Sequence, residues 1–233
     1  MLRNLFFLVF FYSGIILICL IFLPSFILPV RVVLFGGKLM GYWAKICLRL
    51  FLGTKIILKG EENIIKNEKF FIACSHQSMF ETFFLQTVFN SPIFILKKEL
   101  LSIPIFGWYL KKIKSISIDR NKINKENLDF YDKIKISANS TDRPIIIFPQ
   151  ATRVNPHERP PFKKGASRIY EALKIKCQPV AINSGLVWPK KGLLNAGKTI
   201  TISILKPIET NLESKNFLEV LETSIYNELD RLS

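Results

Sequence analysis

The hydrophobic pattern divides the chain into two unequal parts. The stretch from Leu5 to Leu23 is almost continuously apolar, interrupted only by Ser13 and Gly14, and a helix that crosses a bilayer needs about 20 such residues. After it, short apolar runs alternate with amphipathic segments. We therefore predict a membrane anchor and interfacial helix in residues 1–54 and an α/β domain in residues 55–233.

The region after the first apolar run allows more than one interpretation. Phe26 to Phe35 is apolar but short, and it forms either a re-entrant or interfacial segment or the return arm of a hairpin. Between Gly37 and Phe51, the cations Lys38, Lys45 and Arg49 share one stripe at helical spacing. Such a helix lies either in the membrane surface or against the core of the domain.

The distribution of cations predicts an orientation. Only Arg3 and the amino terminus precede the apolar run, whereas six cations and no acid lie between Arg31 and Lys59. The positive-inside rule therefore places everything after the anchor in the cytoplasm. A cleaved signal peptide is the competing interpretation, but the apolar run is long for one and no small-residue cleavage site follows it.

Strands and helices alternate after the anchor, which predicts a central mixed, mostly parallel sheet flanked by helices. The expected strands are Lys55–Leu58, Phe70–Cys74, Ile93–Leu96, Lys114–Ile118, Pro144–Phe148, Val180–Asn183 and Thr199–Ile204. The expected helices are Phe80–Phe89, a short turn near Phe106–Leu110, Lys125–Ser137, Gly165–Leu173 and Asn216–Leu232.

Charge and cysteine content narrow the possible partners. The chain carries 33 Lys and Arg against 18 Asp and Glu, a net charge of +15, which suits a polyanion or an anionic membrane surface. It contains no recognised nucleic-acid motif, so we expect an anionic membrane and no nucleic acid as partner. The four cysteines are widely spaced, which predicts free thiols and neither a disulfide framework nor a metal site.

Four polar stretches follow predicted strands, and in an open α/β sheet such stretches meet at one edge. They are Ser75–Glu81, Asp119-Arg120, Phe148–Arg153 and the residues around Asn183. Together they would combine a histidine base, a carboxylate and arginines that bind phosphate. This combination predicts group transfer to a hydroxyl of a phosphorylated substrate beside a membrane.

The stretch after the second strand also has a purely structural interpretation. Ser78 followed by Glu81 is a capping box, a common device at the start of a helix. His76 would then be an ordinary loop histidine. The functional interpretation makes His76 the base, because the only other histidine, His157, lies in a polar, proline-rich loop. Cys74 belongs to the apolar run, so we expect it to be buried and unreactive.

From about Lys55 to Leu205 the chain resembles the bacterial lysophosphatidic acid acyltransferases of the glycerolipid acyltransferase family. The resemblance rests on His76…Glu81, which matches H-x4-D, and on Phe148–Arg153, which matches FPEGTR. Further matches are Lys97–Leu100 with Ile103-Pro104 and Phe106–Trp108, then Asp119-Arg120, and the late strand that begins at Pro179-Val180.

The resemblance implies that His76 takes the proton from the sn-2 hydroxyl of 1-acylglycerol 3-phosphate. That oxygen then attacks the thioester of an acyl carrier protein or acyl-CoA, giving phosphatidic acid for phospholipid synthesis. Glu81 would orient His76. The substrate-binding residues implied are Lys98, Arg120, Gln150, Ala151, Thr152 and Arg153. Family members need no metal or prosthetic group, and the bacterial cytoplasmic membrane is the implied location.

Three positions depart from the family pattern. Glu81 replaces aspartate and is one methylene longer, Gln150 replaces glutamate and loses its charge, and Ala151 replaces glycine. The last matters if that position needs a positive φ. A different acceptor, such as a lyso-aminolipid or glycerol 3-phosphate, therefore remains an alternative, as does a lipid-binding homologue that does not catalyse.

Overall fold

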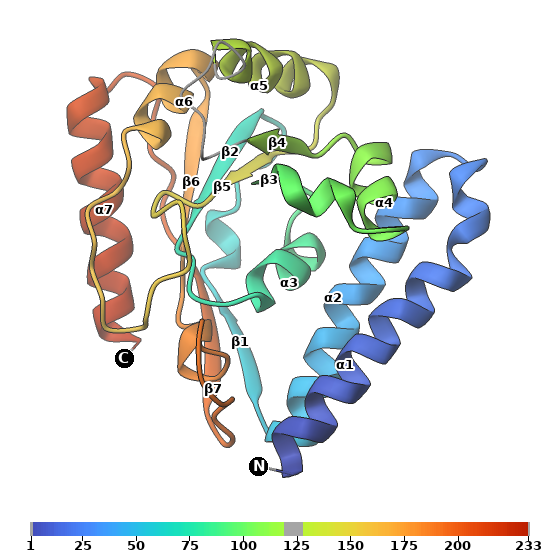
Figure 1. Cartoon of the computed structure of the whole chain (residues 1–233). Helices are drawn as coiled ribbons and strands as arrows, with labels where there is room; N and C mark the ends of the chain where they lie inside the picture. Colours follow the sequence, from blue (N-terminus) through green and yellow to red (C-terminus); the bar gives the residue numbers. More distant parts are fainter. Residues whose placement is uncertain (1, 119–127, 233) are drawn as a thin grey trace.

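The computed structural model describes residues 2–118 and 128–232 and is built on one seven-stranded sheet (Figure 1). The order of the strands in the sheet is β1-β7-β6-β2-β5-β3-β4. Their bounds are β1 (Lys55–Lys59), β2 (Phe70–Cys74), β3 (Ile93–Lys97), β4 (Ile116–Ile118), β5 (Ile145–Ile147), β6 (Lys176–Ile182) and β7 (Thr199–Ile204).

The sheet is mixed and mostly parallel, as predicted. Strands β6, β2, β5, β3 and β4 run in one direction, because each pairs in parallel with its neighbour. Strand β7 pairs antiparallel with β6 and parallel with β1, so these two strands run the other way. The carboxyl ends of five neighbouring strands therefore lie at the same edge.

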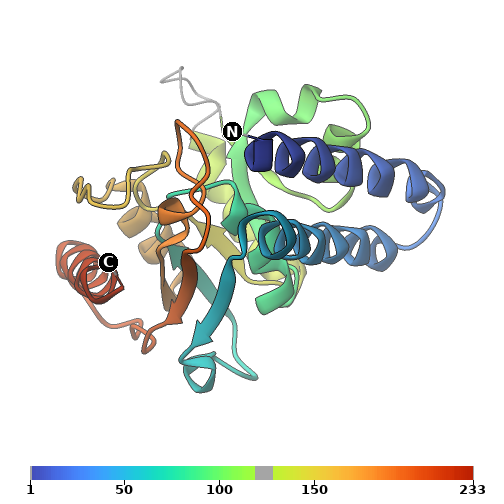
Figure 2. The same cartoon turned by 90° about the horizontal axis from the view of Figure 1, so that it is seen from below.

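Helices cover both faces of the sheet (Figures 1 and 2). On one face, α2 (Val30–Leu52) and α3 (Phe80–Val88) pack on side chains such as Ile72 and Cys74 of β2. On the other, α5 (Leu128–Ser140), α6 (Gly165–Leu173) and α7 (Ser214–Arg231) share a core with Phe71 and Ala73 of the same strand. A strand buried on both faces explains why this run is apolar at every position.

The N-terminal region is a helical hairpin. Helix α1 (Leu2–Ile21) is followed by the short 3₁₀ helix η1 (Leu23–Phe26), and α2 returns beside it (Figure 1). The second apolar stretch is therefore the turn and the start of the return arm. Helix α2 also packs against the domain, with Met40, Ala44 and Leu48 buried, while Tyr42, Ile46 and Leu50 are exposed.

Contacts with the domain fix the hairpin along its length. Phe7 and Phe11 of α1 are fully buried, and each meets the ring of Trp188 edge-on with 5.1 Å between ring centroids. At the tip, Lys112 of α4 (Phe106–Lys112) donates to three carbonyl oxygens of the turn, those of Ser25, Phe26 and Leu28, at 2.6–2.7 Å. The hairpin is therefore packed on the α/β domain rather than joined to it by a flexible linker.

Strand β6 begins at Lys176, earlier than the predicted Val180. Proline is rare in central strands, and the predicted strand began only after Pro179. In the structure the Pro179 carbonyl accepts a hydrogen bond from Leu205, on the β7 side. The proline nitrogen faces the same side, so the pairing of Pro179 with Ala73 of β2 loses no donor.

The turn after β5 places a non-glycine residue in the left-handed region of backbone space. Ala151 has φ of 61°, and its N–H donates to the Phe148 carbonyl at 2.8 Å. A Cβ atom crowds the backbone there, which costs about 1–2 kcal/mol for an ordinary residue. The family's glycine avoids this cost, so the turn of this chain is strained.

We expect Ala151→Gly to raise the free energy of unfolding by about 0.5–1 kcal/mol, because relief of the strain exceeds the entropy that glycine adds to the unfolded chain. Chemical denaturation monitored by circular dichroism measures this change. Ala138→Gly in α5 is the control, and it should lower the free energy of unfolding by up to about 1 kcal/mol. A loss of stability in both variants would contradict the inference that the turn at Ala151 is strained.

Candidate active site

The predicted site residues follow neighbouring strands at the carboxyl edge of the sheet. His76 follows β2, Thr152 and Arg153 follow β5, and Lys98 begins η3 (Lys98–Ser102) directly after β3. Strand β2 pairs with β5 and β6, and β5 also pairs with β3. Strand pairing thus gathers residues that lie far apart in the sequence.

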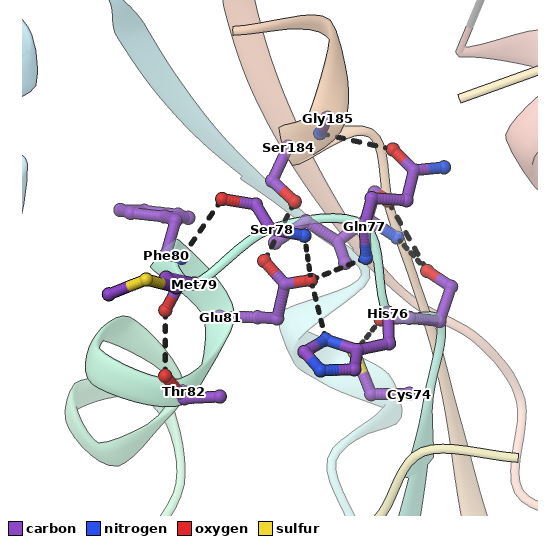
Figure 3. A network of polar contacts seen from close by, with 12 residues as sticks. Cys74, His76, Gln77, Ser78, Met79, Phe80, Glu81, Thr82, Ser184 and Gly185 are labelled. Atoms are coloured by element: carbon purple, nitrogen blue, oxygen red, sulfur yellow. Dashed lines mark hydrogen bonds and ion pairs between the residues drawn. The ribbon is translucent and has the colours of Figure 1, made fainter. Parts of the chain in front are cut away.

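His76 and Glu81 form the centre of the site (Figure 3). The Nδ1 atom of His76 lies 3.1 Å from Oε1 of Glu81. An ionised carboxylate only accepts hydrogen bonds, so Nδ1 carries the proton and Nε2 holds the lone pair. The side chain of His76 is 15% exposed and that of Glu81 is fully buried, so the histidine forms the accessible end of the pair.

The glutamate performs both roles that the sequence allowed. Its Oε1 atom accepts the backbone N–H groups of Gln77 at 2.6 Å and Ser78 at 2.7 Å, while the Ser78 hydroxyl accepts the N–H of Phe80 at 3.0 Å. These contacts cap the start of α3. The same carboxylate faces His76, so the capping interpretation is correct but incomplete.

The loop after β5 holds His76 from the other side. The ring of Phe148 stacks on the imidazole, with 4.0 Å between ring centroids and 19° between planes. The backbone N–H of His76 donates to Oε1 of Gln150 at 2.8 Å, and its carbonyl accepts the N–H of Val154 at 2.9 Å. Two loops from adjacent strands therefore fix the position of the histidine.

The remaining predicted residues fall into buried and accessible groups. Gln150 is buried and its oxygen is bonded within the protein, whereas Thr152 is exposed and Arg153 is half-buried. Lys98 is exposed at the same edge. Arg120 and its neighbour Asp119 lie outside the described residues.

Two other residues with reactive side chains are separate from this chemistry. Cys74 is fully buried, and burial, together with the negative charge of Glu81, raises the pKa of its thiol well above the usual value. It is therefore an unreactive thiol, as predicted. His157 is exposed in its loop.

Three further residues that the sequence analysis did not name as site residues make contacts here. Ser184 begins the 3₁₀ helix η5 (Ser184–Leu186), and its hydroxyl donates to Oε2 of Glu81 at 2.8 Å. Gln77 accepts the N–H of Gly185 at 3.1 Å, and Lys190 lies 3.4 Å from the Thr152 hydroxyl. The contacts of Ser184 and Gln77 form where the segment after β6 meets the loop after β2, and the contact of Lys190 forms where it meets the loop after β5. Periodicity does not encode such contacts.

This arrangement is suited to general base catalysis at Nε2 of His76, in which a carboxylate orients the ring and stabilises an imidazolium. Over residues 2–118 and 128–232, no group of three or more His, Cys, Asp and Glu side chains is arranged to hold a metal ion. Arg153 and Lys98, which follow neighbouring strands at this edge, suit an anionic substrate.

Sequence comparison relates the chain to known proteins. The acyltransferase family model matches residues 55–183. The chain is 34% identical over 174 residues to the 1-acyl-sn-glycerol-3-phosphate acyltransferase of Saccharomyces cerevisiae, which is 72% of this chain and 56% of the yeast protein. It is 33% identical over 156 residues to the 1-acyl-sn-glycerol-3-phosphate acyltransferase of Pseudomonas aeruginosa. This match covers 67% of this chain and 60% of the Pseudomonas protein. The matches thus span less than two thirds of either relative.

Structural comparison gives the same fold. The crystal structure of the 1-acyl-sn-glycerophosphate acyltransferase of Thermotoga maritima superimposes with a TM-score of 0.81 at 19% identity, covering all of this chain and 98% of that one. The predicted α/β architecture is therefore confirmed. From the match of residues 55–183 and the identity to curated relatives, the chain belongs to the acyltransferase family.

Proposed function

We propose that this protein transfers an acyl chain from a thioester to the sn-2 hydroxyl of 1-acylglycerol 3-phosphate, giving phosphatidic acid for phospholipid synthesis. The observation that carries the proposal is the 3.1 Å contact between Nδ1 of His76 and the buried carboxylate of Glu81 at the carboxyl edge of the sheet. Support also comes from relatives that bear the name of this activity.

The reaction needs one proton acceptor and no covalent enzyme intermediate. Nε2 of His76 takes the proton of the acceptor hydroxyl while its oxygen attacks the thioester carbonyl. Glu81 stabilises the imidazolium that forms. When the tetrahedral intermediate collapses, the carbon–sulfur bond breaks and the thiolate takes the proton from His76. The products are an ester and a free thiol, so the enzyme returns to its starting state.

The phosphate of the acceptor would be held by Arg153 and Thr152 after β5, by Lys98 after β3, and by Arg120. Arginine suits this role because its planar fork bonds two phosphate oxygens at once. Lys190 lies beside Thr152 and would add positive charge to the same region. These groups follow neighbouring strands, so one anionic headgroup can reach several of them.

The departures from the family motifs fit an active enzyme. Glu81 still reaches His76, and Ala151 adopts the positive φ that glycine would take. In our proposal Gln150 holds the loop of His76 through its side-chain oxygen, which accepts the backbone N–H of His76. A glutamate could accept the same N–H. The non-catalytic alternative loses its main motivation, while a different lysolipid acceptor remains the second candidate.

The donor would be an acyl carrier protein or acyl-CoA thioester, and no metal or prosthetic group is required. Both donors carry the same thioester, so the proposed chemistry at His76 is common to them.

We also propose that the hairpin attaches the enzyme to the bacterial cytoplasmic membrane with its catalytic domain in the cytoplasm. Helix α1 is long and apolar enough to cross a bilayer. Many of its large apolar side chains are exposed, among them Leu5, Val9, Ile16, Leu17 and Ile21. Soluble proteins rarely expose so large an apolar surface. Lipid contact with this flank would bring the active site to its lysolipid substrate.

We expect His76→Ala to lower kcat at least about 100-fold, since a positioned general base contributes 10²–10⁴ in rate. The measurement is formation of labelled phosphatidic acid from 1-acylglycerol 3-phosphate and a labelled acyl thioester. His157→Ala is the matched control and should retain wild-type activity.

Equal activity in wild type and His76→Ala would remove the histidine from the mechanism. Activity of the wild type only with other lysolipids would keep the mechanism and change the acceptor. No activity with any acceptor would support the non-catalytic alternative.

We expect Arg153→Gln to raise KM for 1-acylglycerol 3-phosphate about 10-fold, because a charge-assisted bond to phosphate is lost. KM for the uncharged 1-acylglycerol should stay the same, and Arg168→Gln on α6 should change neither value. Equal rises for both acceptors would show that Arg153 does not recognise the phosphate.

We expect the double variant Leu17→Gln and Ile21→Gln to bind anionic phospholipid vesicles at least about 10-fold more weakly, because less apolar surface enters the lipid. Vesicle flotation measures the change. The control is Val220→Gln on α7, at the opposite side of the molecule from α1 (Figure 2). Unchanged flotation of the double variant would argue against attachment through α1.

A further inference from the structure

The two oxygen atoms of the buried Glu81 carboxylate have unequal surroundings (Figure 3). Oε1 accepts three donors, which are Nδ1 of His76 and the N–H groups of Gln77 and Ser78. Oε2 accepts the hydroxyl of Ser184 at 2.8 Å. The three donors to Oε1 come from the same loop as the histidine, whereas Ser184 belongs to η5, which follows β6.

This asymmetry matters because the carboxylate ends a flexible side chain. The last torsion of a glutamate is broad, so one oxygen with several donors does not by itself fix the plane of the group. A donor on the second oxygen does fix that plane. Ser184 is fully buried, and a buried carboxylate oxygen without a donor is costly. The Ser184 hydroxyl thus restrains the orientation of the Glu81 carboxylate and stabilises its negative charge.

The position of Ser184 is itself firmly held. The N–H of the next residue, Gly185, donates to the side chain of Gln77, and a Cβ atom on Gly185 would come within 2.9 Å of that side chain. The Ser184 carbonyl accepts the N–H of Trp188 at 2.9 Å. The indole of Trp188 packs edge-on against Phe7 and Phe11 of α1. Contacts with the catalytic loop and the N-terminal helix therefore fix the hydroxyl in space.

We propose that Ser184 is a positioning residue, whose hydroxyl holds the Glu81 carboxylate in the orientation that keeps the His76 proton on Nδ1 and the lone pair on Nε2. Ser184 acts through Glu81 and does not touch the reacting atoms. Its effect on turnover rests on the proposed acyl transfer, while its effect on the histidine tautomer does not.

The first test measures the tautomer of His76 without substrate. Because the chain has only two histidines, ¹⁵N-labelled histidine gives two sets of imidazole signals in the full-length protein, and His157→Gln assigns them. We expect a dominant Nδ1–H tautomer of His76 in the wild type and a smaller Nδ1–H fraction in Ser184→Ala. Ser184→Thr keeps a hydroxyl and should restore the wild-type fraction.

The second test measures acyl transfer. We expect Ser184→Ala to lower kcat about 10- to 100-fold, as for loss of a hydrogen bond to a charged group, with KM changed less than about 3-fold. Ser184→Thr should recover most of kcat. The matched control is Ser203→Ala, which removes a buried serine hydroxyl that donates to Oε1 of Glu228 at 2.7 Å outside the site. It should leave kcat and the His76 signals unchanged.

The outcomes separate this proposal from the function on which its kinetic effect rests. A wild-type tautomer and kcat in Ser184→Ala would overturn the positioning role. Equal losses in Ser184→Ala and Ser203→Ala, with unchanged His76 signals, would also overturn it, because they would indicate a general loss of stability. If the wild type transferred no acyl chain but the tautomer still changed as expected, acyl transfer would fail and the positioning role would stand.

Discussion

A carboxylate that is fully buried depends on the donors around it, and Glu81 organises the site for this reason. An ionised carboxylate away from water is stable only if its oxygens are bonded. Here the donors come from the loop after β2 and from η5 after β6. The parallel pairing of β2 with β6 brings these segments together. The Glu81 side chain therefore contacts the histidine, the loop before α3 and the segment after β6 at the same time.

The N-terminal hairpin is also held in place by its contacts with the domain. One flank of α1 is buried through Phe7 and Phe11 against Trp188, while the other exposes large apolar side chains. Lys112 fixes the tip of the hairpin by donating hydrogen bonds to three carbonyl oxygens of the turn. An apolar surface built this way has a fixed distance and direction to the site around His76, which a flexible tether would not provide.

The departures from the family motifs are accommodated locally. Glu81 accepts the N–H of Ser78 and still reaches His76. Gln150 accepts a backbone N–H, which needs an oxygen but no charge. Ala151 takes a positive φ and accepts strain in the turn after β5. The changes affect backbone strain or charge beside the site, and the hydrogen bonds that hold His76 are still formed.

The sequence by itself predicted the order of strands and helices, the long apolar helix at the N-terminus and the motif residues His76, Glu81 and Arg153, because periodicity and motif spacing are local properties. It left open whether Gly37–Phe51 lies on the membrane or on the domain, and it started β6 at Val180, whereas the strand in the structure begins at Lys176 and includes Pro179. Only the tertiary structure decided the partners of the Glu81 carboxylate. Ser184 lies far from Glu81 in the sequence, and no local pattern encodes a contact that arises when two loops meet at the edge of a folded sheet.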